Sequence, residues 1–122
     1  MTSPPVTLTI PRDPRYVEIV GLVVGGIAAR FDLGVDRVDD LRLAFQTVAF
    51  DGPSDDQLEV EIRCDGGLEL QAGPLASSVR HRLGTETGPL ALCNVLGALV
   101  DEADVIVRDG RDWLTLRQRS AS

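Results

Sequence analysis

The side chains best suited to nucleophilic catalysis lie in one short segment, residues 77–82. Ser77 and Ser78 precede His81, the only histidine of the chain, and a serine beside a histidine is the pattern of a nucleophile and its base. Nothing in the neighbouring sequence orients the imidazole, and Arg80 and Arg82 beside it indicate a solvated surface. We therefore expect a plain exposed helix end, with anion binding by the basic cluster as the less favoured alternative.

Carboxylates form the other candidate sites. They gather in two short groups, namely Asp36, Asp39 and Asp40, and then Asp101, Glu102 and Asp104. Paired carboxylates bind metal ions or transfer protons. Helix capping and solvated turns explain both groups with fewer assumptions, so neither group predicts a site.

The two cysteines, Cys64 and Cys93, lack the close spacing to each other or to His81 that a zinc site needs. Both lie among apolar residues, so we expect two small core side chains. This use of cysteine fits a reducing cytoplasm, and we expect a cytoplasmic protein.

The composition excludes several classes of protein. The formal net charge of −7 disfavours nucleic acid and acidic membrane surfaces as partners, and it favours either simple solubility or a basic protein partner. The first residues lack the pattern of a signal peptide, and no apolar run approaches the roughly 18 residues of a membrane helix. We expect a single domain over residues 1–119, with a disordered tail at 120–122.

The first half of the chain predicts a strand and two helices. Residues 6–10 alternate apolar and polar, as a half-buried strand does. Asp13 and Pro14 then start a helix, in which Gly25 and Gly26 allow another element to pack closely. Its expected buried stripe is Tyr16, Val20, Val23, Ile27 and Phe31. Asp36 caps a second helix, which ends at the breaking segment 51–56, and whose buried stripe is Val38, Leu41, Phe45 and Val48.

The second half predicts two hairpins separated by helix. Residues 58–64 and 68–72 form the first hairpin, and the second turns at Asp109 and Gly110, with Leu114 and Leu116 inward and Trp113 on the polar face. Residues 75–87 form a short helix and a loop. Pro89 opens a third main helix, whose expected inward residues are Leu90, Cys93, Leu96, Leu99 and Val100. The fold class is therefore α+β: a two-layer sandwich with a mixed, mostly antiparallel sheet of about five strands and three helices on one face.

This order of elements resembles the ATPase fold shared by histidine kinases, gyrase, the Hsp90 chaperone and MutL. Within that fold it is similar to anti-sigma factors that are also serine kinases. The stretches that carry the resemblance are 7–11 with 14–17, 38–45, and 90–92 with 99–105.

The resemblance places the family's nucleotide motifs on this chain, where they are altered. The family's second helix carries a Glu, the presumed base, and four residues later an Asn that holds Mg²⁺. Here these positions are Thr47, which cannot act as a base, and Asp51, which retains oxygen ligands but precedes a helix-breaking Gly-Pro.

Two further motifs are altered as well. In the family's Asp-x-Gly-x-Gly motif, Gln71 replaces the Asp that accepts from adenine, Gly73 is kept, and Leu75 replaces the second Gly. In the phosphate-binding Gly-x-Gly-Leu turn, Gly88 is the second residue of the corresponding segment 87–90, and Pro89 removes an N–H donor.

The resemblance thus implies a non-catalytic, anti-sigma-factor-like regulatory protein without a cofactor. Its partner would be a sigma factor or an anti-anti-sigma protein, and family members form homodimers. The alternative is a divergent ATP-dependent serine kinase that uses Asp51 for Mg²⁺ and Gln71, Gly73 and Gly88 for ATP. A scaffold unrelated to transcription is a third possibility.

Overall fold

The structure is a computed structural model that describes residues 4–30, 33–50 and 57–119. Phe31, the segment 51–56 with Asp51, and the expected tail at 120–122 lie outside the described residues. None of the described helices is long and apolar enough to cross a membrane.

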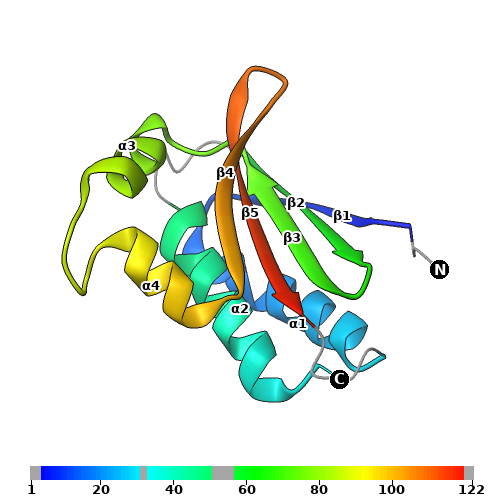
Figure 1. Cartoon of the computed structure of the whole chain (residues 1–122). Coiled ribbons are helices and arrows are strands. Elements are labelled where there is room, and N and C mark those ends of the chain that lie inside the picture. The colour runs from blue at the N-terminus through cyan, green and yellow to red at the C-terminus, as the bar shows by residue number, and fades with distance from the viewer. Residues whose placement is uncertain (1–3, 31–32, 51–56, 120–122) are drawn as a thin grey trace.

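The described strands form one five-stranded sheet (Figure 1). They are β1 (Val6–Pro11), β2 (Gln57–Cys64), β3 (Gly67–Gly73), β4 (Glu102–Arg108) and β5 (Arg111–Arg119). Their order across the sheet is β1-β2-β3-β5-β4, and every neighbouring pair is antiparallel. The α+β class is confirmed. The expectation of a mixed sheet is wrong, because both hairpins and the two remaining pairings all run antiparallel.

The helices cover one face of this sheet (Figure 1). A 3₁₀ turn (Pro14–Tyr16) leads into α1 (Val17–Ala28), which is followed by α2 (Val35–Ala49), α3 (Ser77–Thr85) and α4 (Leu92–Leu99). The predicted order of elements is confirmed, with α3 as the short helix expected within residues 75–87. The Asp13 side chain accepts from the backbone N–H of Arg15, as a helix start requires.

The core follows from the alternation of the strands and from the stripe on α2. Apolar residues of β2, β3 and β5 point toward the helices, and Leu41, Phe45 and Val48 of α2 meet them. The strand residues of this core are Leu58, Val60, Ile62, Cys64, Leu68, Leu70, Ala72, Leu114 and Leu116. Burial raises the pKa of the Cys64 thiol, which fits the predicted role as a small core side chain.

The buried stripe of α1 differs from the predicted one. Its fully buried residues are Val17, Val20, Val24 and Ala28, while Tyr16, Val23 and Ile27 are only partly buried. Gly25 and Gly26 meet nothing within 4 Å, so the expected close packing there is wrong. The close approach occurs at Gly21, where an added Cβ would lie 2.9 Å from Cδ of Arg42 on α2.

Two helix starts also differ from expectation. Gly34, rather than Asp36, occupies the N-cap of α2. The last helix begins at Leu92 rather than Pro89, because Gly88 takes a left-handed φ of +95° and turns the chain first. This shift leaves Leu90 89% exposed and places Cys93 on the surface, so neither is a core residue.

The face of the sheet opposite the helices is polar except around Trp113, which is only 6% exposed and lies opposite Ile106 of β4. The Arg108 guanidinium lies over its indole, 4.3 Å from the ring centroid. Arg108 also donates to Glu61 at 3.0 Å and to Gln71 at 3.1 Å. Side chains from neighbouring strands thus bury an aromatic residue that the alternation of β5 alone had assigned to the polar face.

Candidate functional site

In the family that this chain resembles, phosphate binds at the N-terminal end of the last helix, which corresponds to α4 here. In this chain the carboxylate of Glu86 lies at that position. Oε1 of Glu86 accepts from the backbone N–H of Leu92 at 2.9 Å, and Oε2 accepts from Nε of Arg82 at 3.0 Å. The Leu92 hydrogen bond, followed by the Arg82 one, lowers the pKa of the Glu86 carboxyl. A helix N-terminus favours an anion, and this chain supplies its own.

The turn before α4 is closed by further contacts within the chain. The carbonyl of Gly88 accepts from the Ala91 N–H at 3.1 Å and from Nδ2 of Asn94 at 2.6 Å. Pro89, the residue after Gly88, has no backbone N–H that could donate to a ligand. The carbonyl of Gly88, a candidate nucleotide-contacting residue, is therefore already hydrogen-bonded within the chain.

Thr47 lies half-buried in the last turn of α2, two residues before Ala49. Its hydroxyl donates to the carbonyl of Leu43 at 2.7 Å, the usual i−4 bond of a helical threonine. The Thr47 hydroxyl is thus engaged with its own helix. Asp51, the candidate Mg²⁺ ligand, lies outside the described residues.

Gln71 lies on the open face of the sheet, whereas Thr47 lies on a helix that packs against the opposite face. The Gln71 amide accepts from Arg108 and donates to Oε1 of Glu69 at 3.2 Å. Because successive side chains of a strand alternate between faces, the neighbouring Ala72 is the one that points toward the helices. The structure does not bring Gln71 and Thr47 together.

Gly73, at the end of β3, has a packing role in this chain. A Cβ at this position would lie 2.5 Å from the Trp113 ring, which no real contact allows. The absence of a side chain makes room for the indole on the open face. Leu75 just beyond is buried, and its N–H donates to the carbonyl of Asp112 at 2.8 Å.

A buried arginine joins the two segments that carry the altered motifs. Nη1 of Arg12 donates to the carbonyl of Ala49, the last residue of α2, at 2.7 Å. Nη2 donates to the carbonyl of Pro74, directly after β3. The guanidinium thus fixes the end of α2 beside the end of β3. Nothing in the sequence pattern indicated Arg12, since an arginine after a strand usually faces water.

The described residues of these motifs are engaged within the chain. Glu86 accepts from the Leu92 N–H of α4, the Gln71 amide faces away from α2, and the Trp113 indole packs against Gly73 on the open face. Within the described residues, no group of three or more His, Cys, Asp and Glu side chains is arranged to hold a metal ion.

Comparisons with known proteins bear on the fold. No protein-family model matches the sequence, and no curated protein matches it. Among solved structures, the chain is similar to the crystal structure of the RsbU and RsbW domains of Rv1364c from Mycobacterium tuberculosis, with a TM-score of 0.60 and 16% identity. The two share a fold. The match covers 96% of this chain and 32% of that one, so the chain spans about a third of its neighbour's length. The predicted histidine kinase-like fold is confirmed.

The other candidate residues are placed as follows. His81 is exposed on α3, and its carbonyl accepts from the Thr85 hydroxyl at 2.8 Å. Arg80 donates to Oδ1 of Asp112 at 2.8 Å, which ties α3 to β5 and lowers the pKa of the Asp112 carboxyl. His81 is exposed, as the sequence interpretation expected, but it lies at the centre of α3 and not at a helix end.

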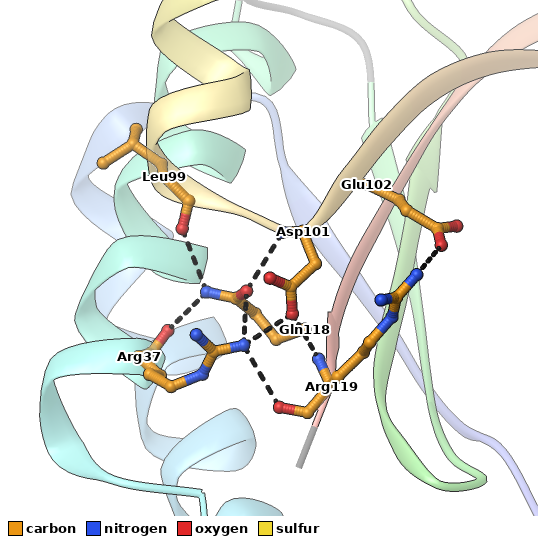
Figure 2. Close-up of polar contacts among 6 residues, drawn as sticks. All are labelled: Arg37, Leu99, Asp101, Glu102, Gln118 and Arg119. Carbon is orange, nitrogen blue, oxygen red and sulfur yellow. Dashed lines mark hydrogen bonds and ion pairs between the residues drawn. The ribbon is translucent and has the colours of Figure 1, made fainter. Parts of the chain in front are cut away.

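The second acidic group has a structural partner that the sequence did not reveal, the buried Gln118 of β5. Figure 2 shows its amide between α2, α4 and the start of β4. Nε2 donates to the carbonyls of Arg37 and Leu99 at 3.1 and 3.0 Å, and Oε1 accepts from Nη2 of Arg37 and the N–H of Asp101, both at 3.2 Å.

Asp101 completes this cluster. Its Oδ2 accepts from the Arg119 N–H at 2.7 Å and from Nη2 of Arg37 (Figure 2). The Arg119 hydrogen bond, followed by the Arg37 one, lowers the pKa of the Asp101 carboxyl despite an opposing effect of burial. Gln118 continues the every-second-residue pattern of Leu114 and Leu116 on β5. This alternation was the sequence signal that could have predicted a buried amide.

Proposed function

We propose that this chain is a non-catalytic regulatory domain of the anti-sigma-factor type that acts by binding a protein and does not use nucleotide. The fold shared with the RsbU–RsbW structure supports the regulatory class. The partner would be a sigma factor or an anti-anti-sigma protein. The net charge of −7 favours a partner with a basic contact surface.

The observation that carries the proposal is the Glu86 carboxylate at the start of α4. A phosphate that approached the Leu92 N–H would have to displace this carboxylate from both Leu92 and Arg82. Until it did so, two negative groups would lie close together, which costs free energy at short range. A self-capped helix of this kind supports loss of nucleotide binding.

The open face adds an independent argument. The Gln71 amide already bonds to Arg108 and Glu69. To accept from an adenine amino group beside α2, it would have to leave both partners and cross to the other face of the sheet. That rearrangement would leave the Arg108 guanidinium with one acceptor fewer above the Trp113 ring.

Isothermal titration calorimetry with ATP and Mg²⁺ tests the nucleotide half of the proposal. We expect no saturable heat up to millimolar nucleotide from the wild-type chain or from the Gln71→Ala variant. Saturable heat that Gln71→Ala removes would instead support the divergent kinase, with Asp51 and Gln71 as its ligands.

Affinity capture from a lysate of the source organism tests the protein-binding half. The immobilised chain should retain a sigma factor or an anti-anti-sigma protein, and raising the salt concentration should weaken the complex. Retention of proteins unrelated to transcription only would support a scaffold role and overturn the anti-sigma assignment.

A further inference from the structure

Strand β4 lies at one end of the sheet, and no other described strand pairs with its outer side (Figure 1). It is joined to β5 by the two-residue loop Asp109-Gly110, whose φ angles are both positive, at 54° and 75°. In such a hairpin the flanking residues, here Arg108 and Arg111, exchange both backbone hydrogen bonds.

The backbone groups that β4 leaves unpaired follow from this turn. Hydrogen-bonded pairs recur at every second residue, so the N–H and C=O groups of Arg108, Ile106 and Asp104 point toward β5. Those of Ala103, Val105 and Val107 therefore point outward from the sheet. Val107, the next-to-last residue of β4, is 66% exposed, a high value for a large apolar residue of a strand.

The sheet edge is bordered by an open groove on its helix side. The groove has a volume of about 360 Å³ and lies between α3, α4 and β4. Its apolar lining comes from Leu83, Cys93, Ala103 and Val105, and Arg80 and Asp104 lie at its margin. An extended strand beside β4 would therefore meet both open backbone groups and apolar side chains.

We infer that the outer edge of β4 pairs antiparallel with β4 of a second copy of this chain, about a two-fold axis at Val105. In this register Val105 lies opposite its own counterpart, and Ala103 lies opposite Val107 of the second copy. All three are residues whose backbone groups point outward, so about six backbone hydrogen bonds form across the axis. The two sheets join into one, and the same surface is used by both copies.

The charges of β4 select this register and this partner. Glu102, which accepts from Arg119 within its own chain, falls opposite Arg108 of the second copy, which donates to its own Glu61 and Gln71, so opposite charges adjoin on both sides of the axis. A shift of the axis to Asp104 would place Asp104 against Asp104 and leave Arg108 beyond the paired strand. A shift of the axis to Ile106 would keep one kind of opposite-charge pair but pair fewer residues. The register about Val105 alone pairs the whole of β4.

The same register covers the exposed apolar side chain. Val107 of the second copy lies opposite Ala103, which lines the groove, and both face the helix side of the sheet. The pairing thus removes from water a side chain that the single chain leaves exposed. This inference does not depend on the proposed function, and it assigns a surface to the homodimer that the sequence resemblance only suggested.

Analytical ultracentrifugation of the full chain over a concentration series tests the pairing. We expect a species of about twice the 13.1 kDa of one chain. Val105→Pro removes an outward N–H and leaves the ladder to β5 intact, as proline at a strand edge does. It should weaken dimerisation at least tenfold, and Val107→Glu should do the same.

Leu22→Glu on α1 is the matched control, because Leu22 is also a strongly exposed apolar residue, at 76%. It should leave the dimer unchanged, and circular dichroism checks that each variant is folded. A monomer at every concentration, or a dimer that Leu22→Glu disrupts and Val105→Pro does not, would overturn the inference.

Amide hydrogen exchange measured by NMR tests the register itself. Protection of the Ala103, Val105 and Val107 amides should rise with protein concentration, while Asp104 and Ile106 should be protected already in the monomer. A dimer in which these three amides stay unprotected would place the interface elsewhere.

Discussion

The two ends of α4 are held in different ways. At the C-terminal end, the amide of Gln118 is 1% exposed and bonds to groups of Arg37, Leu99 and Asp101, which come from three other segments of the chain. At the N-terminal end, the Leu92 N–H is held by Glu86, only six residues away, with Arg82 beside it. The contacts at the first end join distant segments and are buried, whereas those at the second end are local and half-buried.

This difference shows that the C-terminal end of α4 serves the fold, whereas the N-terminal end is where a ligand site could be gained or lost. A buried amide with four satisfied bonds cannot change without leaving several groups unpaired, so the C-terminal end fixes how α2, α4 and the sheet meet. A half-buried carboxylate that is held only by local contacts at a helix start can be exchanged at a smaller cost in stability. A nucleotide site at that end can therefore be lost while the fold persists.

The largest expected effect is at the buried end. Gln118→Leu keeps the approximate size but removes the hydrogen bonds to the carbonyls of Arg37 and Leu99 and one of the two acceptors of the Asp101 N–H, which keeps its bond to the Arg117 carbonyl. Each buried group that loses its partner costs roughly 1–3 kcal/mol, so we expect a loss of about 2 kcal/mol or more in the free energy of unfolding by urea. Gln71→Leu, on the open face, is the control. A smaller loss for Gln118→Leu than for Gln71→Leu would contradict the comparison.

The next effect concerns a glycine of the altered motif. Gly73→Ala would force its Cβ against the Trp113 ring, and we expect a loss of about 2 kcal/mol of stability together with a change in tryptophan fluorescence. Gly25→Ala, in a helix where nothing lies within 4 Å, should instead stabilise by up to about 1 kcal/mol. Equal effects of the two substitutions would remove the packing role that we assign to Gly73.

A smaller effect should depend on pH. The folded state lowers the pKa of the Asp101 carboxyl, so the unfolded chain binds this proton more tightly. Its contribution is complete above the unfolded pKa of about 4 and is lost as the pH falls through the folded pKa. Asp101→Asn should therefore be less stable than wild type at pH 7, and the difference should shrink toward pH 3 in urea unfolding. A constant difference over this range would exclude the ionised carboxylate as the cause.

The smallest effect is expected at the N-terminal end of α4. The pKa of Glu86 is also lowered, so Glu86→Gln should show the same sign of pH dependence as Asp101→Asn, with a smaller loss of stability. Thermal unfolding of both variants in the same buffers measures this order. The reverse order would mean that the N-terminal end of α4 matters more to the fold than we infer.

The sequence predicted what periodicity and turn residues control. The order of elements, the inward residues of β2, β3 and β5, and the Asp13 helix start were all confirmed. The start of α4 was misplaced because the left-handed turn at Gly88 outweighs the preference of proline for the first helical turn. Cys93 and Leu90 became surface residues as a consequence.

The contacts of the site could not be predicted in the same way, because they join residues that are distant in the sequence. Arg108 buries Trp113 and reaches Glu61 across two strands, and no local pattern indicates this. Burial alone would raise the pKa of the Glu61 carboxyl, but hydrogen bonds from Arg63 and Arg108 outweigh it and lower the pKa. Glu86 lay in the weakly patterned segment 75–87, where its role depends on a turn that only the folded chain makes.

The most direct test of the account follows the Leu92 amide by NMR during titration with ATP and Mg²⁺. Because Glu86 already accepts from this N–H, we predict that its chemical shift stays unchanged up to millimolar nucleotide and moves only when acid protonates the carboxylate. A saturable shift of the Leu92 amide at neutral pH, with nucleotide in the micromolar range, would contradict the central claim that the chain occupies its own phosphate position.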